Sequence, residues 1–535
     1  MSEFEIVIRG GAVLDGTGSE PVVADIGISD GVIQAVSGPR AADGTNPPSR
    51  AERLTGHRVI DASDRVVAPG FIDLHSHADF TLEGWPAATT ELHQGVTTLL
   101  TGNCGFSPFP VGDVEEAKTA SAFLAPELSW SWRDHDGFAA ALDKARPAIN
   151  VAAQTGHSSL RLAAMGGAER EASPDDLARM SALLAEAAGS GAHGFSTGLI
   201  YAPGTYSNEE EVRQLVGVAA DAGLLYSTHI RNEAEHLHEA IAEAIRAAEA
   251  TGARLQISHL KAAGPRNHGA VTGALRLIDD AAARGVDVAA DVYPYTASST
   301  TLTTRLPAWA LDGGPPELLR RLRHSGERER IAAELRHEAD QTLGPENVVI
   351  ADLGDGRYRD AVGSSLADVA RREGTDPAEV TLRILEEHDA AVAVVMHGMS
   401  DDDVETVLRH PRVAVASDGW VMRPEGAGKP HPRNFGTFPR VLARYVRERG
   451  VLSLPEAVRK MTSLPASRLG LDGRGIIRPG AAADVVVFDP DTVTDRSTFA
   501  DPWQLSTGVS TVLVNGQIAL EGDPTGSRAG RVLFR

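Results

Sequence analysis

The sequence of 535 residues predicts an α/β fold, a (β/α)8 TIM barrel with a small β-sandwich domain and an insertion between late barrel strands. Three observations predict this fold. The middle of the chain alternates apolar strands with alanine-rich helical stretches, both ends show short strands separated by turns, and one interval between strands is far longer than the others. Alternating strands and helices are typical of parallel barrels, and a chain of this length exceeds one ordinary core.

The first part of the β-sandwich is expected in residues 1–65. The segment Phe4–Ile8 alternates apolar and polar residues, and a turn is predicted at Arg9–Gly11. Alternation bounded by Gly, Asp and Ser is the signal of hairpins. Residues 38–57 are polar and predict a flexible loop. Further strands are expected at residues 12–14, 22–28 and 32–36.

The barrel is expected in residues 66–470. Helices are predicted between several of its strands, at Pro174–Ala188, Glu209–Ala222 and Glu233–Thr251. Short intervals of this kind fit one crossover helix between neighbouring parallel strands. The eight predicted strands end near His75, Leu100, Ala153, Ser196, Thr228, Ser258, Asp291 and Ser417.

The interval between the last two barrel strands is too long for one helix. It runs from Asp291 to Asp418 and contains charged helical segments at Pro316–Arg321 and Glu327–Ala339. We expect residues 300–390, approximately, to form an insertion, a lid or subdomain over the mouth of the barrel.

The C-terminal residues 471–535 return to the strand pattern of the N-terminus. Apolar strands are expected at Ala483–Phe488, Val512–Val514 and Val532–Phe534. We therefore expect the two ends of the chain to build one β-sandwich domain together.

Composition excludes several classes of protein. The formal net charge of −22 argues against binding to nucleic acid or to an anionic membrane. No apolar run approaches the length of a membrane span, and residues 1–5 lack the features of a signal peptide, so a cytoplasmic location is expected. A single cysteine, Cys104, excludes an intrachain disulfide. The sequence leaves the oligomeric state open.

Potential metal ligands stand at the ends of several predicted strands. His75 and His77 are two residues apart, so both side chains lie on one side of the strand. Cys104 sits in a glycine-rich turn after the next strand, and His229 and His259 each end a strand. Barrel active sites gather at the carboxyl ends of the strands, where these side chains would converge. Imidazole and thiolate are strong zinc ligands, although a single histidine or cysteine at such a place is more often structural.

Asp418 ends the last predicted strand, in the segment Val413–Gly419. An aspartate there can cap the following helix. Beside a metal it can instead act as a general base.

The motifs resemble the amidohydrolase superfamily, and more closely the D-aminoacylase, or N-acyl-D-amino-acid deacylase, family. The resemblance extends over nearly the whole chain. The opening segment is shared by many amidohydrolases, whereas the Gly-Asn-Cys-Gly turn and the His-Ile-Arg-Asn-Glu segment are more discriminating. The segments that carry it are Pro69–His77, Gly102–Gly105, Gly156–Arg161, Ser196–Gly204, Thr228–Glu233, Ser258–Lys261, Ser417–Gly419 and His431–Arg433.

The resemblance implies a zinc-dependent hydrolase that releases a carboxylate and a free D-amino acid from an N-acyl-D-amino acid. Cys104, His229 and His259 would hold one zinc ion tightly. His75 and His77, with Asp418, would form a second, weaker position whose occupancy the sequence leaves open.

The resemblance also implies the remaining roles in the active site. Asp418 would be the general base and acid of the reaction. Lys261, Tyr293 and Arg433 match family positions that hold the substrate carboxylate, and Ser298 lies where the side chain is read. The D-configuration rests on the resemblance alone, and the acyl group, the preferred side chain and the physiological substrate stay open.

Two other functions compete with this hypothesis. The first is an amidohydrolase acting on another C–N bond, in a cyclic amide, a dipeptide or an N-acyl-L-amino acid. Cyclic amide hydrolases normally use a bridging carboxylated lysine, and Cys104 argues against them. The second is a non-catalytic scaffold that kept the fold, but such proteins usually lose their metal ligands.

Overall fold

At the centre of the computed structural model, which describes residues 3–37, 53–124 and 127–535, lies an eight-stranded parallel sheet. Its strand order is β16-β12-β11-β10-β9-β8-β7-β6. Main-chain hydrogen bonds from Asp418 to His75 and from His77 to Gly419 join the two outer strands, so the barrel is nearly closed. The predicted barrel is confirmed. Its strands are β6 (Phe71–Asp73), β7 (Val96–Thr101), β8 (Asn150–Gly156), β9 (Gly194–Gly198), β10 (Leu225–His229), β11 (Arg254–Ile257), β12 (Val288–Val292) and β16 (Val413–Val415).

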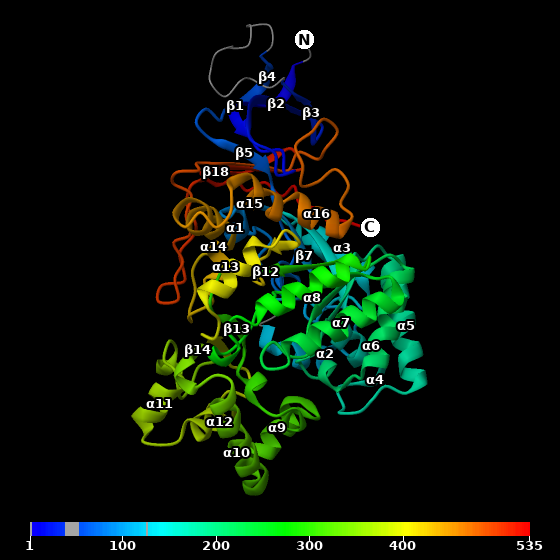
Figure 1. Ribbon diagram of the computed structural model, residues 1–535, viewed down its shortest axis with the longest axis vertical. Coiled ribbons are helices and arrows are strands. Elements are labelled where there is room, and N and C mark those ends of the chain that lie inside the picture. The colour runs from blue at the N-terminus through cyan, green and yellow to red at the C-terminus, as the bar shows by residue number, and fades with distance from the viewer. Residues whose placement is uncertain (1–2, 38–52, 125–126) are drawn as a thin grey trace.

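Helices cover the outside of this sheet, and α4 to α8 lie side by side on one flank (Figure 1). Helix α5 begins at Pro174, as the sequence predicts. Ser173 caps it, and Ser173 and Asp176 form a reciprocal capping box across the first turn. The helices associated with the barrel are α1 (Thr89–Leu92), α2 (Val114–Ser121), α3 (His135–Ala145), α4 (His157–Met165), α5 (Pro174–Gly189), α6 (Glu209–Asp221), α7 (Leu237–Thr251), α8 (Val271–Ala283), α13 (Asp401–Arg409), α14 (Arg433–Arg440), α15 (Leu454–Met461) and α16 (Ser463–Leu469).

Helix α7 begins later than its sequence predicts. The prediction started the helix at Glu233, whereas the first helical residue is Leu237. The side chain of Asn232 accepts hydrogen bonds from the main-chain N–H groups of Ala234 and His236. This side-chain turn competes with helix formation, and it leaves Glu233 at the carboxyl end of β10.

Strands from both ends of the chain form one nine-stranded sheet, at the top of Figure 1. Strand β5 from the N-terminal part pairs with β17 from the C-terminal part, and Ile8, Ile26 and Val487 belong to the core that the two parts share. The domain boundaries at residues 65 and 470 stay a prediction. The strands are β1 (Phe4–Val13), β2 (Val22–Ser29), β3 (Val32–Val36), β4 (Gly56–Asp61), β5 (Val66–Pro69), β17 (Val485–Phe488), β18 (Val509–Val514), β19 (Gln517–Glu521) and β20 (Asp523–Pro524).

Three predictions for the chain ends differ from the structure or fall mostly outside the described residues. The turn predicted at Arg9–Gly11 is wrong, because β1 runs through it with a shift of register between Ile8 and Gly11, where the two glycines accommodate a bulge. The terminal segment at Val532 pairs with barrel strand β8 rather than with the terminal sheet. Most of the flexible loop predicted at residues 38–57 lies outside the described residues.

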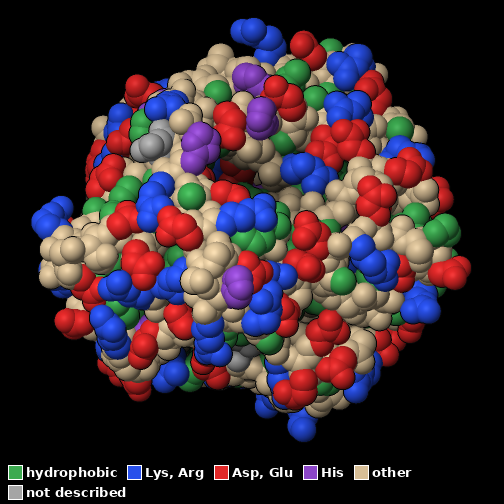
Figure 2. Space-filling model, turned by 90° about the horizontal axis from the view of Figure 1, so that it is seen from below, with side chains coloured by type: hydrophobic (Ala, Val, Ile, Leu, Met, Phe, Trp, Pro, Cys, Tyr) green, Lys and Arg blue, Asp and Glu red, His purple; other side chains and the backbone are tan. Residues whose placement is uncertain are grey.

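The long interval between β12 and β16 forms a separate layer with its own hydrophobic core, which includes Leu318, Ile331 and Val380. This insertion lies at the lower end of Figure 1, and on the face seen in Figure 2 acidic and basic side chains are interspersed. Its three antiparallel strands have the order β13-β15-β14. The elements are β13 (Ser298–Thr301), α9 (Gly314–Arg323), α10 (Ser325–Gln341), β14 (Val348–Asp352), α11 (Leu366–Glu373), α12 (Pro377–Glu387) and β15 (Ala393–Met396).

Among the described residues, none of the helices combines the length and the apolar character that crossing a membrane requires.

A buried acid in helix α1 predicts a dependence of stability on pH. Burial raises the pKa of Glu91 from 4.5 to about 8, although Thr90 donates a hydrogen bond to its carboxylate at 2.7 Å. Between these two pH values the folded chain binds more protons than the unfolded chain, so this group destabilises the fold progressively as the pH rises from 4.5 to about 8. Replacing Glu91 with Gln should therefore stabilise the protein above pH 8.

The measurement is the free energy of unfolding in urea for the parent and for Glu91→Gln, at two pH values. Because the Gln side chain is neutral throughout, the variant should gain at least about 1.4 kcal/mol over the parent in moving from acidic to alkaline pH. A difference between the two proteins that does not change with pH would show that Glu91 ionises normally.

Candidate metal centre and active site

A cavity opens at the carboxyl ends of the barrel strands, between the barrel and the insertion, with about 780 Å³ of empty space, open solvent included. The segment Ser298–Thr300 and Met396 reach it from the insertion. Five of the six residues predicted as metal ligands or general base line its barrel side, and the sixth, His75, contacts Cys104. The residues lining that side include His77, Cys104, His229, His259 and Asp418.

The thiol of Cys104 lies at the centre of a group of imidazoles. Its Sγ is 3.3 Å from His75 Nε2, 3.4 Å from His259 Nε2 and 3.6 Å from His229 Nδ1. Burial raises the pKa of the Cys104 thiol, but the charges of His75 and His259 and a hydrogen bond with His229 outweigh it and hold the pKa well below its ordinary value. This shift favours the thiolate, the form of cysteine that binds metals.

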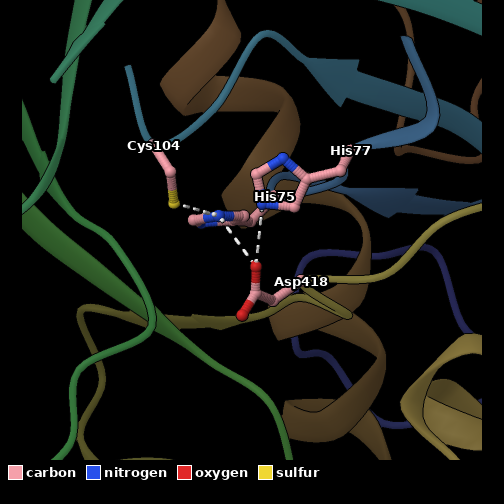
Figure 3. Close-up of side chains that lie close together, drawn as sticks. All are labelled: His75, His77, Cys104 and Asp418. Carbon is pink, nitrogen blue, oxygen red and sulfur yellow. Dashed lines mark hydrogen bonds and ion pairs between the residues drawn. The ribbon is translucent and has the colours of Figure 1, made fainter. Parts of the chain in front are cut away.

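Two overlapping groups of potential ligands share this thiolate. The first consists of Cys104, His229 and His259, and the second of His75, His77, Cys104 and Asp418. In each group the ligand atoms all lie within 4.8 Å of one another. Figure 3 shows His75 between Cys104 and Asp418 in the second group.

Carboxylates lie behind His75, His229 and His259, on the side of each ring away from Cys104, as is usual in zinc sites. Glu233 lies 3.1 Å from His259 Nδ1 and 3.6 Å from His229 Nε2, and Asp291 lies 3.3 Å from His75 Nδ1. A carboxylate behind each imidazole fixes the tautomer and turns the other nitrogen toward a metal. Thiolate and imidazole are the ligands that zinc prefers, so the residues present fit this ion.

Three of the candidate residues have main-chain conformations that are rare without glycine. The φ angles are 52° at Cys104, 34° at His259 and 53° at Asp418. Backbone in this left-handed region is strained for residues with a Cβ, and such strain is concentrated at functional sites. Gly102 and Gly105 flank Cys104, and both also have positive φ. The tight turn that the sequence predicts there is what directs the thiol into the cavity.

A buried aspartate ties the two outer barrel strands together beneath the site. Asp73 Oδ1 accepts hydrogen bonds from the main-chain N–H groups of His75 and Ser417, at 3.2 and 2.9 Å. These contacts hold the two strand ends that carry His75 and Asp418.

Asp418 contacts three basic side chains around the cavity. Its Oδ1 lies 3.2 Å from His77 Nε2 and 3.3 Å from His75 Nε2, and its Oδ2 lies 2.7 Å from Arg433 Nη1. Burial raises the pKa of the Asp418 carboxyl, but the Arg433 guanidinium and the imidazoles hold it well below its ordinary value. This shift favours the ionised carboxylate.

All four predicted substrate-binding residues line the cavity, but they differ in whether their polar atoms already have partners. The ammonium of Lys261 contacts Glu233 and lies 2.8 Å from His259 Nδ1. Within the described part of the chain, Tyr293 Oη and Arg433 Nε have no hydrogen-bond partner. These are buried donors that a substrate carboxylate can satisfy. Ser298 lies on β13, opposite Met396 on β15.

The sequence alone assigned no role to Glu233 and Asp291, whose carboxylates lie behind the imidazoles. Glu233 follows His229 by four residues, and Asp291 ends a barrel strand just as His229 and His259 do. The position at a strand end was the available signal for Asp291. His157 pairs with Glu211 at 2.8 Å and does not line the cavity.

The comparisons with known proteins agree with this geometry. A model of the amidohydrolase family matches residues 58–520. The chain is 38% identical to N-acyl-D-glutamate deacylase of Alcaligenes xylosoxydans xylosoxydans over 533 residues, which is 100% of this chain and 97% of that protein. It is 34% identical to D-aminoacylase of the same organism over 536 residues, 99% of this chain and 98% of that one. The chain belongs to the N-acyl-D-amino-acid deacylase family of amidohydrolases. The predicted family is thereby confirmed.

Solved structures of this family share the fold. N-acyl-D-glutamate deacylase of Bordetella bronchiseptica, complexed with zinc and a phosphonate mimic of the tetrahedral intermediate, has a TM-score of 0.84, 36% identity and full coverage of both chains. A D-aminoacylase with a binuclear metal centre, described by one-metal activation and second-metal attenuation, has a TM-score of 0.83 at 34% identity and covers 99% of this chain and 100% of that one. A D-hydantoinase has a TM-score of 0.54 at 17% identity, which shows the shared fold alone.

Proposed function

We propose that this family member hydrolyses the amide bond of N-acyl-D-amino acids and releases a carboxylate and a free D-amino acid. The observation that carries the proposal is the convergence of one cysteine, four histidines and an aspartate at the carboxyl ends of the barrel strands. The family relationship supplies the substrate class. The cytoplasmic location expected from the sequence stays a prediction.

Cys104, His229 and His259 are the residues that we propose to hold the first zinc ion. His75 and His77, with Asp418 and the shared Cys104, would hold a second ion at lower affinity, because a carboxylate that is also paired with Arg433 is a weaker ligand. When bound, zinc supplies Lewis-acid polarisation of the amide carbonyl and lowers the pKa of a coordinated water.

Asp418 handles the proton in the proposed mechanism. Its carboxylate accepts a proton from the attacking water and delivers that proton to the leaving amide nitrogen, so that the C–N bond breaks with a neutral amine as leaving group. Arg433 Nη1 holds Oδ2 at 2.7 Å, which leaves Oδ1 facing the imidazoles to receive the proton.

Arg433 and Tyr293 orient the substrate. Their unpaired donors, Nε of the arginine and Oη of the tyrosine, are proposed to bind the α-carboxylate. The Tyr293 hydroxyl stays protonated because burial raises its pKa well above the ordinary value. Lys261 adds positive charge nearby, although Glu233 neutralises part of it.

An assay panel tests the proposed activity. The zinc-loaded protein should hydrolyse N-acetyl-D-methionine with a kcat/KM far above those for N-acetyl-L-methionine and for 5-substituted hydantoins. Faster hydrolysis of a hydantoin or of the L-enantiomer would support the competing amidohydrolase function instead. A scaffold without catalytic activity would hydrolyse none of them and would bind no zinc.

Glu233 is expected to position the imidazoles of the first zinc site. Replacing it with Gln removes the charge behind His229 and His259, and the loss of such a partner lowers metal affinity by about 10–100-fold. Competition with a chelator measures the zinc dissociation constant directly. The variant should need more free zinc for half-maximal activity, and saturating zinc should restore most of kcat.

The matched control is Glu235→Gln, which makes the same change of charge two residues away at an exposed position. It should leave the zinc dissociation constant unchanged. Equal zinc affinities in both variants would remove Glu233 from the site.

A further inference from the structure

The walls of the cavity offer little positive charge to a second carboxylate. Among the described residues that line it, the basic ones other than histidine are Lys261 and Arg433. Each already faces an acid, since Lys261 contacts Glu233 and Arg433 pairs with Asp418 at 2.7 Å. Arg433 Nη2 also donates a hydrogen bond to the Ser299 carbonyl at 3.3 Å.

The unpaired donors that remain belong to one cationic and two neutral side chains. Among the described lining residues other than histidine, Arg433 Nε, Tyr293 Oη and Trp420 Nε1 have no hydrogen-bond partner. The α-carboxylate of an N-acyl amino acid would occupy Arg433 Nε and Tyr293 Oη, which leaves a neutral indole N–H. A carboxylate in the substrate side chain would then be buried near Glu233 and Asp418 without a cation, which is costly.

One basic residue of the insertion adjoins the cavity lining in sequence but does not itself line the cavity. Arg305 follows the cavity-lining Thr304 directly in sequence. Its guanidinium pairs with Glu338 and donates to the Leu343 carbonyl at 2.6 Å, inside the insertion. Arg305 is therefore engaged elsewhere and does not supply charge to the pocket.

We expect the side chain of a bound substrate to lie next to the insertion wall, for a geometric reason. It branches from the same carbon as the α-carboxylate, whereas the acyl group lies across the scissile amide. The wall beside Arg433 and Tyr293 is formed by β13 and β15, where Ser298 pairs in register with Met396 and Ala393 also lines the cavity. Hydroxyl, methyl and thioether groups suit an uncharged side chain, and Met adapts its shape to different ones.

We infer that this pocket selects N-acyl-D-amino acids with uncharged, mainly apolar side chains, and rejects those of D-glutamate and D-aspartate. The inference rests on the proposed deacylase function. The inferred preference for uncharged side chains differs from the substrate in the name of the N-acyl-D-glutamate deacylase to which this chain is 38% identical.

The test compares kcat/KM for the N-acetyl derivatives of D-methionine, D-glutamine, D-glutamate and D-aspartate. D-Glutamine and D-glutamate have nearly the same size, so their ratio isolates the effect of charge. We expect D-methionine to exceed D-glutamate by at least about 100-fold, and D-glutamine to exceed D-glutamate as well. A kcat/KM for D-glutamate equal to or above that for D-methionine would overturn the inference and leave the proposed function standing. Hydrolysis of none of the four would overturn the proposed function and this inference with it.

A substitution in the wall tests the same inference from the opposite direction. Met396→Lys places an ammonium opposite Ser298, so kcat/KM for N-acetyl-D-glutamate should rise at least about tenfold while that for N-acetyl-D-methionine falls. Met396→Leu keeps the wall apolar and should keep the parent preference. A Met396→Lys protein that folds, binds zinc and still prefers D-methionine by the parent ratio would show that this wall does not contact the side chain.

Discussion

Replacing Asp418 with Asn should lower kcat by about 10²–10⁴-fold, the range that a positioned general acid–base supplies. The amide cannot accept the proton of the attacking water or deliver it to the leaving nitrogen. The substitution keeps the size of the side chain and an oxygen that can face Arg433, so folding should be preserved. KM should change much less than kcat, because the loss affects the transition state rather than substrate binding.

Zinc content distinguishes this effect from loss of the metal. Cys104, His229 and His259 are untouched in Asp418→Asn, so elemental analysis should find the first zinc ion at the parent level. The control is Asp280→Asn on helix α8, where the aspartate is exposed and does not line the cavity. It should have parent activity. Parent-like turnover by Asp418→Asn would remove this residue from the proton-transfer step.

Replacing Cys104 with Ala should have the second large effect, on the metal itself. Cys104 is the one residue common to both groups of potential ligands. Zinc sites in proteins bind with about 10–16 kcal/mol over four ligands, so loss of one ligand should weaken zinc binding by about 10²–10³-fold. Activity at trace zinc should disappear, and added zinc should restore little of it because the site has lost its anionic ligand.

A histidine outside the site provides the control for this experiment. His397→Ala removes an imidazole that packs against Phe499 and belongs to neither ligand group. Its zinc content should match the parent. Far-ultraviolet circular dichroism shows whether Cys104→Ala folds, and a folded Cys104→Ala protein with parent zinc affinity would contradict the proposed centre.

The barrel was predictable because its strands are buried on both faces. Segments such as Val96–Thr101 and Leu225–His229 are buried at every residue, as the strands of a parallel barrel are, and their Val, Thr and Tyr residues favour strands. The position of each ligand at the end of a strand followed from the same pattern. The convergence of Cys104, His229 and His259 therefore follows from the topology of the barrel. Their proposed roles as zinc ligands come from the resemblance to the D-aminoacylase family.

The parts that the sequence did not predict depend on long-range contacts. The bulge at Gly10 and Gly11 is set by pairing with a strand that lies further along the chain, so local turn propensity misled there. The pairing of Lys261 with Glu233 depends on where two strand ends meet, and charge alone does not reveal it. The closing of the insertion sheet against the cavity brings Met396 next to Ser298 across nearly a hundred residues, a contact that no local pattern indicates.

Zinc-dependent hydrolysis of N-acyl-D-amino acids is tested most directly by titrating zinc into the metal-free protein with N-acetyl-D-methionine and N-acetyl-L-methionine as parallel substrates. The proposed site predicts no turnover without metal, then activity toward the D-enantiomer that rises with the first equivalent of zinc while the L-enantiomer stays inert. Equal activity in the metal-free protein, or activity that appears first with the L-enantiomer, would contradict it.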